Sequence, residues 1–331
     1  MRVFMDILLM LGGVAVFLYG MKQMSAGLEQ GAGAGIRKLF KRIDKNSMIN
    51  YGVGVGVTAI VQSSSATSVM TVGLANAGIV NVKQGAGIML GAKVGTTFNA
   101  FLVVLGLINK GGFSFGVLFA SAAFVGIIIT YISNKDSLNK LALFLIGFGM
   151  LFVGLEVMGI ALGANDSILG EKIQEMLLFR VMQQPVMLVL TGVILTCIIQ
   201  SSTAAIFVFL SLLSKGMIPG LDQAFFLMMG ANIGTCVDGL MASIGTNADA
   251  KRVAIFHLLT STIGAVVFSI ILAVLRTPVT LLFDSLQDAP TGLALYNLSY
   301  NLIYTLLLLP LLGPLVRLVT KMVKDKRTPV D

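Results

Sequence analysis

Long apolar segments that carry almost no charged side chains recur along the whole chain. Seven of them are long enough to be membrane spans: residues 3–21, 85–108, 113–132, 141–162, 223–244, 253–275 and 293–316. A helix needs about 20 predominantly apolar residues to cross the hydrocarbon core of a bilayer. The pattern therefore predicts an all-α polytopic membrane protein.

Two further apolar regions, residues 48–80 and 185–213, are interrupted near their middles by polar residues. The first interruption runs from Gln62 to Ser68, and the second runs from Gln200 to Thr203. Each half of such a region has about 15 residues, which form only about 22 Å of helix. Because this length is too short to cross a bilayer comfortably, each region is predicted to be a re-entrant helical hairpin with a polar tip.

The two polar runs belong to an internal repeat. The Gln-Ser-Ser-Ser sequence at Gln62 and the Gln-Ser-Ser-Thr sequence at Gln200 start 138 residues apart. The sequence Gly-Ala-Lys-Val-Gly-Thr-Thr at Gly91 and the sequence Gly-Ala-Asn-Ile-Gly-Thr-Cys at Gly230 start 139 residues apart. Two motifs that recur in the same order and with the same spacing indicate a duplication.

The duplication divides the chain into three parts. Residues 1–135 form repeat one and residues 138–276 form repeat two, each with one span, one hairpin and two more spans; residues 290–331 hold a last transmembrane helix and a basic tail. Because three crossings is an odd number, the second repeat is predicted to enter the membrane upside down. Such inverted repeats are typical of secondary transporters, whose sites lie near the bilayer midplane.

The composition supports a membrane location and excludes several other classes of protein. Hydrophobic residues make up 56% of the chain and charged residues only 11%, whereas soluble domains carry about 25% charged residues. This balance excludes a soluble enzyme, a disordered tail and a disulfide-stapled secreted domain. The net charge of +8 is attributed to cytoplasmic loops, so no nucleic-acid partner is expected.

The distribution of Lys and Arg predicts the orientation. If the loop at residues 36–46 is cytoplasmic, 16 of the 23 basic residues fall on the inside, including Lys22 just after the first predicted span. Cytoplasmic loops of membrane proteins carry such an excess. We therefore expect a multi-pass protein of the cell inner (plasma) membrane, embedded in the lipid bilayer, with a cytoplasmic C-terminus.

The repeated motifs resemble those of the sodium/phosphate cotransporter family. The resemblance extends from Leu8 to Phe268, and in repeat two it includes Ala-Ser-Ile-Gly at Ala242 and Lys-Arg-Val-Ala-Ile-Phe-His-Leu-Leu at Lys251. It implies a sodium-coupled symporter that moves inorganic phosphate by alternating access. It also implies Na⁺ as the coupling ion, no cofactor and no enzymatic activity.

The hairpin tips carry the residues expected to bind phosphate. A helix N-terminus offers free N–H groups and the positive end of the helix dipole, and hydroxyl and amide side chains add donors. The predicted phosphate ligands are Gln62, Ser63, Ser64, Ser65, Gln200, Ser201, Ser202 and Thr203. Helix–helix packing is the alternative role for small polar residues in membranes, but two matching runs at two predicted breaks favour a binding site.

Oxygen atoms of the same motifs can coordinate a hard cation such as Na⁺. The predicted sodium ligands are Gln62, Ser65, Thr67, Thr96, Thr97, Gln200, Thr203, Asn232, Thr235 and Asp238. Bound Na⁺ offsets the charge of phosphate, so each ligand lowers the cost of binding the other. With a single histidine in the chain, no other metal is expected, and His257 is expected to have a structural, hydrogen-bonded role.

Two ionisable residues depart from the pattern of the family. Lys93 stands where the family usually has the Asn that Asn232 supplies in repeat two, and Asp238 stands where a hydroxyl residue is commoner. A lone charge at membrane depth usually has a partner or lines the pathway. We hypothesise that Lys93 lies close to the site and replaces one Na⁺, with Asp238 or Glu156 as counter-ion. The alternative is that Lys93 snorkels to the cytoplasmic interface.

Several readings of the function stay open at this point. Transport of another small oxyanion, or export of phosphate, would use the same motifs. A channel would keep a continuous polar path, and a membrane scaffold or sensor would make the tip hydroxyls dispensable. The sequence leaves open whether the chain forms a homodimer and how many Na⁺ ions accompany each phosphate.

Overall fold

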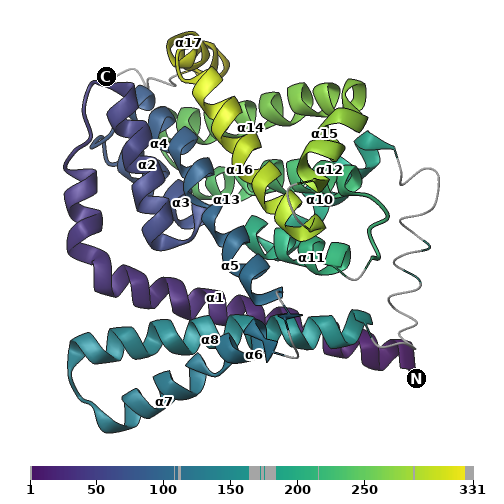
Figure 1. Cartoon of the computed structure of the whole chain (residues 1–331). Coiled ribbons are helices and arrows are strands. Elements are labelled where there is room, and N and C mark those ends of the chain that lie inside the picture. Colours follow the sequence, from purple (N-terminus) through teal and green to yellow (C-terminus); the bar gives the residue numbers. More distant parts are fainter. Residues whose placement is uncertain are drawn as a thin grey trace.

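Helices account for nearly all of the described chain, as the apolar pattern predicts (Figure 1). The structure is a computed structural model that describes residues 2–107, 109–110, 113–163, 172, 175, 184–214, 216–285 and 288–324. Within this part, two short strands, β1 (Asn109–Lys110) and β2 (Phe113–Ser114), pair antiparallel. The all-α fold class is thereby confirmed.

Six helical segments of the described residues are long and apolar enough to cross a bilayer: Phe4–Ile36, Val82–Gly106, Phe115–Ile132, Asp136–Ala161, Leu221–Ala242 and Ala248–Val274. A bent pair of helices near the C-terminus raises the number to seven. These segments overlap the seven predicted spans. The chain is therefore a polytopic membrane protein, although the first and last spans differ from their predicted bounds.

The first helix, α1 (Arg2–Phe40), continues far beyond the predicted span at residues 3–21. The segment contains no proline, so nothing removes a backbone donor from its hydrogen-bond ladder. Lys22 therefore lies inside a helix and not in a loop that follows a span.

Glycines bring α1 close to α8 (Asp136–Gly163), which lies along it (Figure 1). A Cβ atom on Gly20 would lie 2.8 Å from the carbonyl oxygen of Gly147, and one on Gly154 would lie 2.7 Å from that of Gly13. Small residues that allow such close backbone approach favour helix association in membranes. Two shorter helices, α6 (Phe115–Ala120) and α7 (Ala122–Ile132), also pack on α8.

Two broken helix pairs and the helices that follow them form the other part of the molecule. The first group comprises α2 (Ser47–Val61), α3 (Ser64–Asn76), α4 (Val82–Gly95) and α5 (Phe98–Leu107). The second group comprises α10 (Pro185–Ile199), α11 (Ser202–Ser214), α12 (Leu221–Gly234) and α13 (Cys236–Ala242). Helix α2 packs on α4, and α10 packs on α12.

The same glycine contacts recur in both groups. A Cβ atom on Gly95 would lie 2.7 Å from the carbonyl oxygen of Val55, and one on Gly234 would lie 2.8 Å from that of Val193. Each glycine thus lets the helix after a hairpin press against the backbone of the first arm. The two halves of the chain build this junction with residues at matched sequence positions.

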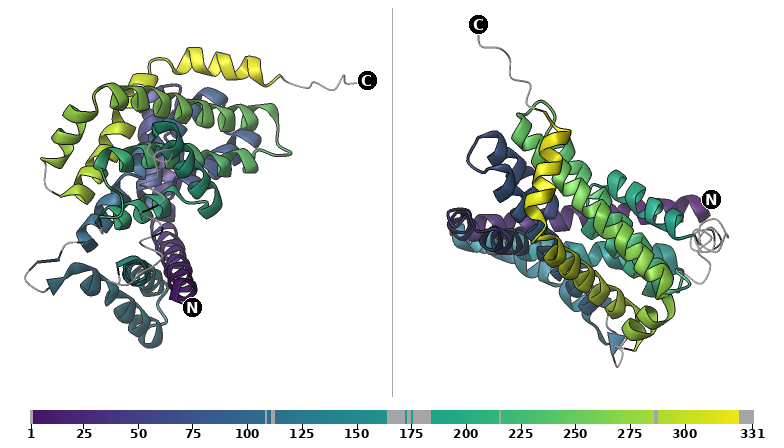
Figure 2. Two further views of the ribbon diagram at one scale, coloured as in Figure 1. Left: turned by 90° about the vertical axis from the view of Figure 1, so that its right-hand side faces the viewer. Right: turned by 90° about the horizontal axis from the view of Figure 1, so that it is seen from above.

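The C-terminal part bends where the sequence predicts a continuous span at residues 293–316. After α14 (Ala248–Val274) and α15 (Arg276–Asp284), helix α16 (Ala289–Leu308) ends, and α17 (Leu312–Met322) leaves it at an angle of 81°. Pro310 lies in the break and lacks the N–H group that a continuous helix requires. Figure 2 shows α17 at the edge of the molecule. The predicted span at residues 293–316 is therefore not one continuous helix but contains a bend between α16 and α17.

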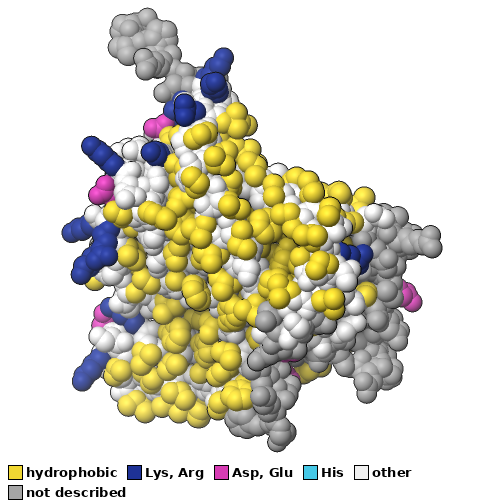
Figure 3. Space-filling model, turned by 45° about the horizontal axis from the view of Figure 1, so that its top comes forward, with side chains coloured by type: hydrophobic (Ala, Val, Ile, Leu, Met, Phe, Trp, Pro, Cys, Tyr) yellow, Lys and Arg dark blue, Asp and Glu magenta, His cyan; other side chains and the backbone are white. Residues whose placement is uncertain are grey.

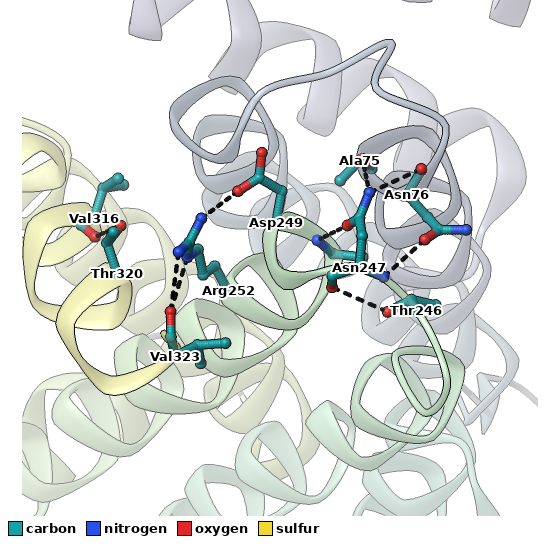
Figure 4. Close-up of polar contacts among 10 residues, drawn as sticks. Ala75, Asn76, Thr246, Asn247, Asp249, Arg252, Val316, Thr320 and Val323 are labelled. Carbon is teal, nitrogen blue, oxygen red and sulfur yellow. Dashed lines mark hydrogen bonds and ion pairs between the residues drawn. The ribbon is translucent and has the colours of Figure 1, made fainter. Parts of the chain in front are cut away.

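The start of α14 is hydrogen-bonded to two other elements (Figure 4). The Asn247 side chain donates to the carbonyl oxygen of Asn76 at 2.9 Å, and its backbone N–H donates to the Asn76 side chain at 3.0 Å. Arg252 donates to the carbonyl oxygen of Val323 at 3.0 Å and to the Asp249 carboxylate at 2.6 Å. The ends of α3 and α17 are thus both anchored to α14.

Hydrophobic side chains cover much of the surface seen in Figure 3, and Lys and Arg gather at its edges. Large apolar side chains are strongly exposed on helices α7 and α10, for example Tyr131 at 87%, Ile132 at 80% and Ile198 at 74%. Apolar exposure on this scale is unfavourable in water and is suited to contact with lipid.

Candidate functional site

Both predicted hairpin tips are helix breaks, and each is built around a glutamine in the left-handed conformation. Helix α2 ends at Val61 and is followed by Gln62 with φ 60°, while α10 ends at Ile199 and is followed by Gln200 with φ 56°. The N–H group of each glutamine donates 2.7 Å bonds, to the carbonyl oxygens of Thr58 and Thr196 respectively. Non-glycine residues seldom adopt this conformation, and its occurrence at both matched positions marks a constrained turn.

The residue after each glutamine caps the next helix. The Ser63 hydroxyl accepts from the N–H of Ala66 at 3.1 Å, and the Ser201 hydroxyl accepts from the N–H of Ala204 at 3.2 Å. A helix N-terminus has several N–H groups without intrahelical partners, so one cap leaves others available. The first turns of α3 and α11 therefore keep the capacity to bind an anion.

A cavity of about 350 Å³ lies between the two tips. Its lining includes all eight residues predicted as phosphate ligands: Gln62, Ser63, Ser64, Ser65, Gln200, Ser201, Ser202 and Thr203. The remaining lining comes from Ala66 and from α1. The fold thus brings together two motifs that lie far apart in the sequence, with the hydroxyl and amide side chains of both around one space.

One face of α1 completes the cavity with three polar side chains that the sequence analysis did not select: Lys22, Ser25 and Glu29. Their spacing of three and four residues places them on a single helix face. The same spacing in the sequence could have indicated that face, but only if the helix were known to continue beyond Met21. The cavity therefore has one cationic and one anionic side chain on the wall opposite the tips.

The predicted sodium ligands divide into two groups in space. Gln62, Ser65, Gln200 and Thr203 line the cavity, whereas Thr67, Thr96, Thr97, Asn232, Thr235 and Asp238 do not. Three threonines of the second group donate to backbone carbonyl oxygens of the preceding helical turn. The hydroxyl of Thr96 donates to the carbonyl oxygen of Lys93 at 3.0 Å, that of Thr97 to Val94 at 2.7 Å, and that of Thr235 to Ala231 at 2.9 Å. Such donation occupies the hydroxyl proton and leaves oxygen lone pairs, which a cation could use.

Gln62 at the first tip and Asn99 on α5 each have a buried side-chain oxygen without a hydrogen-bond partner among the described residues. The side-chain amide of Asn99 donates to the carbonyl oxygen of Gln62 at 3.0 Å. The side-chain oxygens of Gln62 and Asn99 are both buried and accept no hydrogen bond among the described residues. Because an unpaired buried acceptor is unfavourable, these two oxygens are suited to a cation or a water molecule. Asn99 was not among the predicted ligands.

Lys93 is buried in the interior and does not extend to the surface. Its side chain is 3% exposed, and Nζ donates to the carbonyl oxygen of Asn232 at 2.7 Å. The described ion pairs do not include Lys93. Of its two predicted counter-ions, Glu156 is exposed on α8, and Asp238 accepts a hydrogen bond from the Ser65 hydroxyl.

A buried polar contact joins α3 to α14. The Ser68 hydroxyl lies 3.4 Å from Nδ1 of His257, which is 1% exposed. The histidine is thus buried in the core with Ser68 beside Nδ1, while Nε2 has no hydrogen-bond partner among the described residues. Cys197 and Cys236 are free cysteines.

A helical membrane protein with a polar cavity between two broken helices has the architecture of a membrane transporter. The sequence pattern of the Na⁺/Pi-cotransporter family matches residues 16–160 and residues 164–289. The chain belongs to this Na⁺/Pi-cotransporter family, which is a family of membrane transporters.

Curated relatives are identical to the chain at about a quarter of the aligned positions. The chain is 27% identical over 251 residues to the uncharacterized protein YqeW of Bacillus subtilis, covering 76% of this chain and 78% of that protein. It is 27% identical over 293 residues to the putative inorganic phosphate export protein YjbB of Salmonella typhimurium, covering 88% of this chain and 51% of that protein. For the Escherichia coli protein of that name the identity is 26% over 264 residues, covering 80% and 46%. The chain thus spans about half the length of the YjbB proteins. No solved structure matches it.

Proposed function

We propose that the chain is a sodium-coupled symporter that moves inorganic phosphate across the inner (plasma) membrane by alternating access. The observation that carries the proposal is the cavity lined by both hairpin tips and by α1. Membership of the Na⁺/Pi-cotransporter family supports both phosphate and Na⁺ as the transported species.

Phosphate binds, in this proposal, between the N-termini of α3 and α11. The hydroxyls of Ser64 and Ser202, which line the cavity, and the N–H groups of the two first turns donate to its oxygens. Hydrogen bonds to a charged group in a desolvated site are stronger than those between neutral groups. Lys22 adds a positive charge from α1, so the anion is held without a cluster of arginines.

Sodium binds, in this proposal, beside the first tip and close to the phosphate. The unpaired side-chain oxygens of Gln62 and Asn99 and the carboxylate of Asp238 are suitable ligands for a hard cation. A cation at this position attracts the phosphate anion, and the anion in turn attracts the cation. Mutual attraction of this kind couples the two fluxes.

The duplicated hairpins supply the two states that alternating access requires. The arms are only 15 and 13 residues long in both hairpins, about 20–23 Å at 1.5 Å per residue, which favours re-entrant segments. We propose that the second repeat is inverted relative to the first and that the C-terminus is cytoplasmic. The hairpins then open toward opposite faces of the membrane, one after the other.

Export of phosphate is the second candidate function, and the names of the YjbB relatives favour it. The direction depends on the ion gradients. Each net positive charge that moves inward gains about 2.3 kcal/mol per 100 mV, and a hundredfold phosphate gradient opposes uptake with about 2.8 kcal/mol. Two net charges therefore drive uptake with ease, whereas an electroneutral symport gains nothing from the membrane potential and its direction is set by the Na⁺ and phosphate gradients alone.

Radiolabelled phosphate flux in proteoliposomes tests the proposal. The full chain is reconstituted with Na⁺ or choline outside and with the membrane potential set by potassium and valinomycin. The expected result is a saturable uptake that requires Na⁺ and increases with inside-negative potential. A flux that is linear in phosphate and indifferent to Na⁺ would contradict the symporter. Sulfate and arsenate as competitors establish whether phosphate is the preferred oxyanion.

A further inference from the structure

The buried ammonium group of Lys93 joins the two halves of the chain. Lys93 is on α4, and its Nζ donates to the backbone oxygen of Asn232 on α12 at 2.7 Å. Its other described contact is Sγ of Cys236 at 3.8 Å. Among the described residues no carboxylate forms an ion pair with it. The Lys93 amine thus lies in the protein interior beside a backbone carbonyl.

This carbonyl lies at a place that is suited to a free cation. Asn232 belongs to the last turn of α12, which ends at Gly234 before the short helix α13 begins. The last carbonyl groups of a helix lack intrahelical partners, and the negative end of the helix dipole is there. The C-terminal ends of broken helices coordinate coupling cations in secondary transporters.

The matched position in the other repeat does not make the reverse contact. Position 232 corresponds to position 93 at the offset of 139 residues. The Asn232 side chain donates to the carbonyl oxygen of Met228 on its own helix at 3.2 Å, so it does not reach α4. The cross-repeat contact is therefore one-sided and depends on the length and charge of Lys93.

We infer that the Lys93 ammonium is a tethered cation that occupies the position of one coupling Na⁺ at the C-terminal end of α12. The chain then transports one Na⁺ fewer per phosphate than it would with a neutral residue at position 93. Because Lys93 returns with the protein in every cycle, its charge does not contribute to the net charge transported. The statement that one Na⁺ fewer is transported per phosphate rests on the proposed symport. The statement that the Lys93 ammonium occupies a cation position does not depend on it.

Sodium binding tests the cation position without any transport. The variant Lys93→Asn carries the residue found at the matched position and removes the ammonium contact from the Asn232 carbonyl, which keeps its contact with Sγ of Cys236 at 3.7 Å. Its melting temperature is measured in detergent at increasing NaCl, with choline chloride holding the ionic strength constant. We expect a Na⁺-dependent rise in melting temperature that exceeds that of the unmodified chain, with the Hill coefficient for Na⁺ increased by about one.

Two control variants separate charge from position. Lys83→Asn removes an exposed lysine of the same helix, and Lys93→Arg keeps the buried charge; both are expected to retain the Na⁺ response of the unmodified chain. If Lys93→Asn fails to fold, Lys93→Gln removes the charge with a longer side chain. Charge-neutral variants that respond to Na⁺ as the unmodified chain does would overturn the inference.

The charge moved per phosphate gives a second readout in proteoliposomes. The reversal potential is measured at fixed Na⁺ and phosphate gradients, and Lys93→Asn is expected to move one more positive charge per phosphate. If the unmodified chain shows no Na⁺-driven phosphate flux, the proposed function is contradicted. The melting curves then still decide whether Lys93 fills a cation position. Unchanged charge per phosphate in an active Lys93→Asn variant would contradict the tethered cation alone.

Discussion

The hydroxyl of Ser65 on α3 donates a hydrogen bond to the carboxylate of Asp238 on α13, across 173 positions of the sequence. This contact joins the tip of the first hairpin to the helix break of the second half. A hydrogen bond to an ionised acceptor is stronger than one between neutral groups. The tip cannot move away from α13 without breaking this bond, so the contact ties the position of one half to that of the other.

Replacement of Asp238 by asparagine is expected to weaken Na⁺ binding. The substitution keeps the shape and an acceptor for Ser65 but removes the negative charge that attracts a cation. We expect the Na⁺ concentration for half-maximal phosphate uptake to rise about tenfold, equivalent to about 1.4 kcal/mol. Asp222→Asn is the control, because Asp222 pairs with Arg276 at 2.5 Å and does not line the cavity. Equal Na⁺ dependence in the two variants would exclude Asp238 as a sodium ligand.

Removal of single tip hydroxyls is expected to weaken phosphate binding. Ser64→Ala and Ser202→Ala each delete one donor from the cavity. A hydrogen bond to a charged group contributes about 1.5–3 kcal/mol, so the dissociation constant for phosphate should increase roughly 10- to 150-fold. Ser211→Ala, which alters a buried serine of α11 outside the cavity, should leave it unchanged. Equilibrium binding of radiolabelled phosphate measures all three, and normal affinity in both tip variants would remove the tips from the site.

Lys22 provides a test of the cavity wall on α1. Lys22→Gln keeps a polar side chain of similar length and removes the positive charge opposite the tips. We expect the phosphate concentration for half-maximal uptake to rise about tenfold at low ionic strength and less at high ionic strength, because salt screens partly exposed charges. Lys83→Gln, an exposed lysine of α4, is the matched control. If both variants have the same half-saturation, Lys22 makes no contact with the anion.

Accessibility from the two faces of the membrane tests the inverted repeat. In a background without Cys197 and Cys236, single cysteines replace Ala66 near the first tip or Ala204 near the second. The first is expected to react with an impermeant maleimide from the cytoplasmic face, and the second from the outer face. The labelling is done both with and without Na⁺ and phosphate, so that both states are sampled. Reaction of both cysteines from one face only would indicate a parallel repeat.

The sequence predicted the helix breaks correctly because their cause is local. A run of Gln, Ser and Thr in the middle of an apolar region cannot face lipid, so it must lie at a helix end or in the protein interior. The structure accordingly ends α2 at Val61 and α10 at Ile199. The matched glycine motifs were also visible in the sequence. In the structure, the glycines of each motif lie against the backbone of the preceding broken helix pair at corresponding positions.

The bounds of α1 and of the last span could not be read from hydropathy alone. The polar residues after Met21 resemble a loop in composition, yet they continue a helix of which one face lines the cavity together with the two tips. At the other end, apolar residues extend beyond Leu308, but α17 turns away and packs against α14, where Arg252 bonds to its end. Mean hydropathy depends only on which residues are apolar. It contains no information on which face of a helix packs against other helices.

The sequence by itself determined the class of protein, the two helix breaks and the polar residues at them, because hydrophobic length and helix-breaking polarity are local properties of the chain. Only the tertiary structure decided that both tips share one cavity with Lys22 and Glu29, and that Lys93 reaches the carbonyl of Asn232. The cavity lining includes residues as far apart in the sequence as Lys22 and Thr203, and the Lys93 contact joins residues 139 positions apart. They arise from the packing of whole helices, so no pattern within a single segment specifies them.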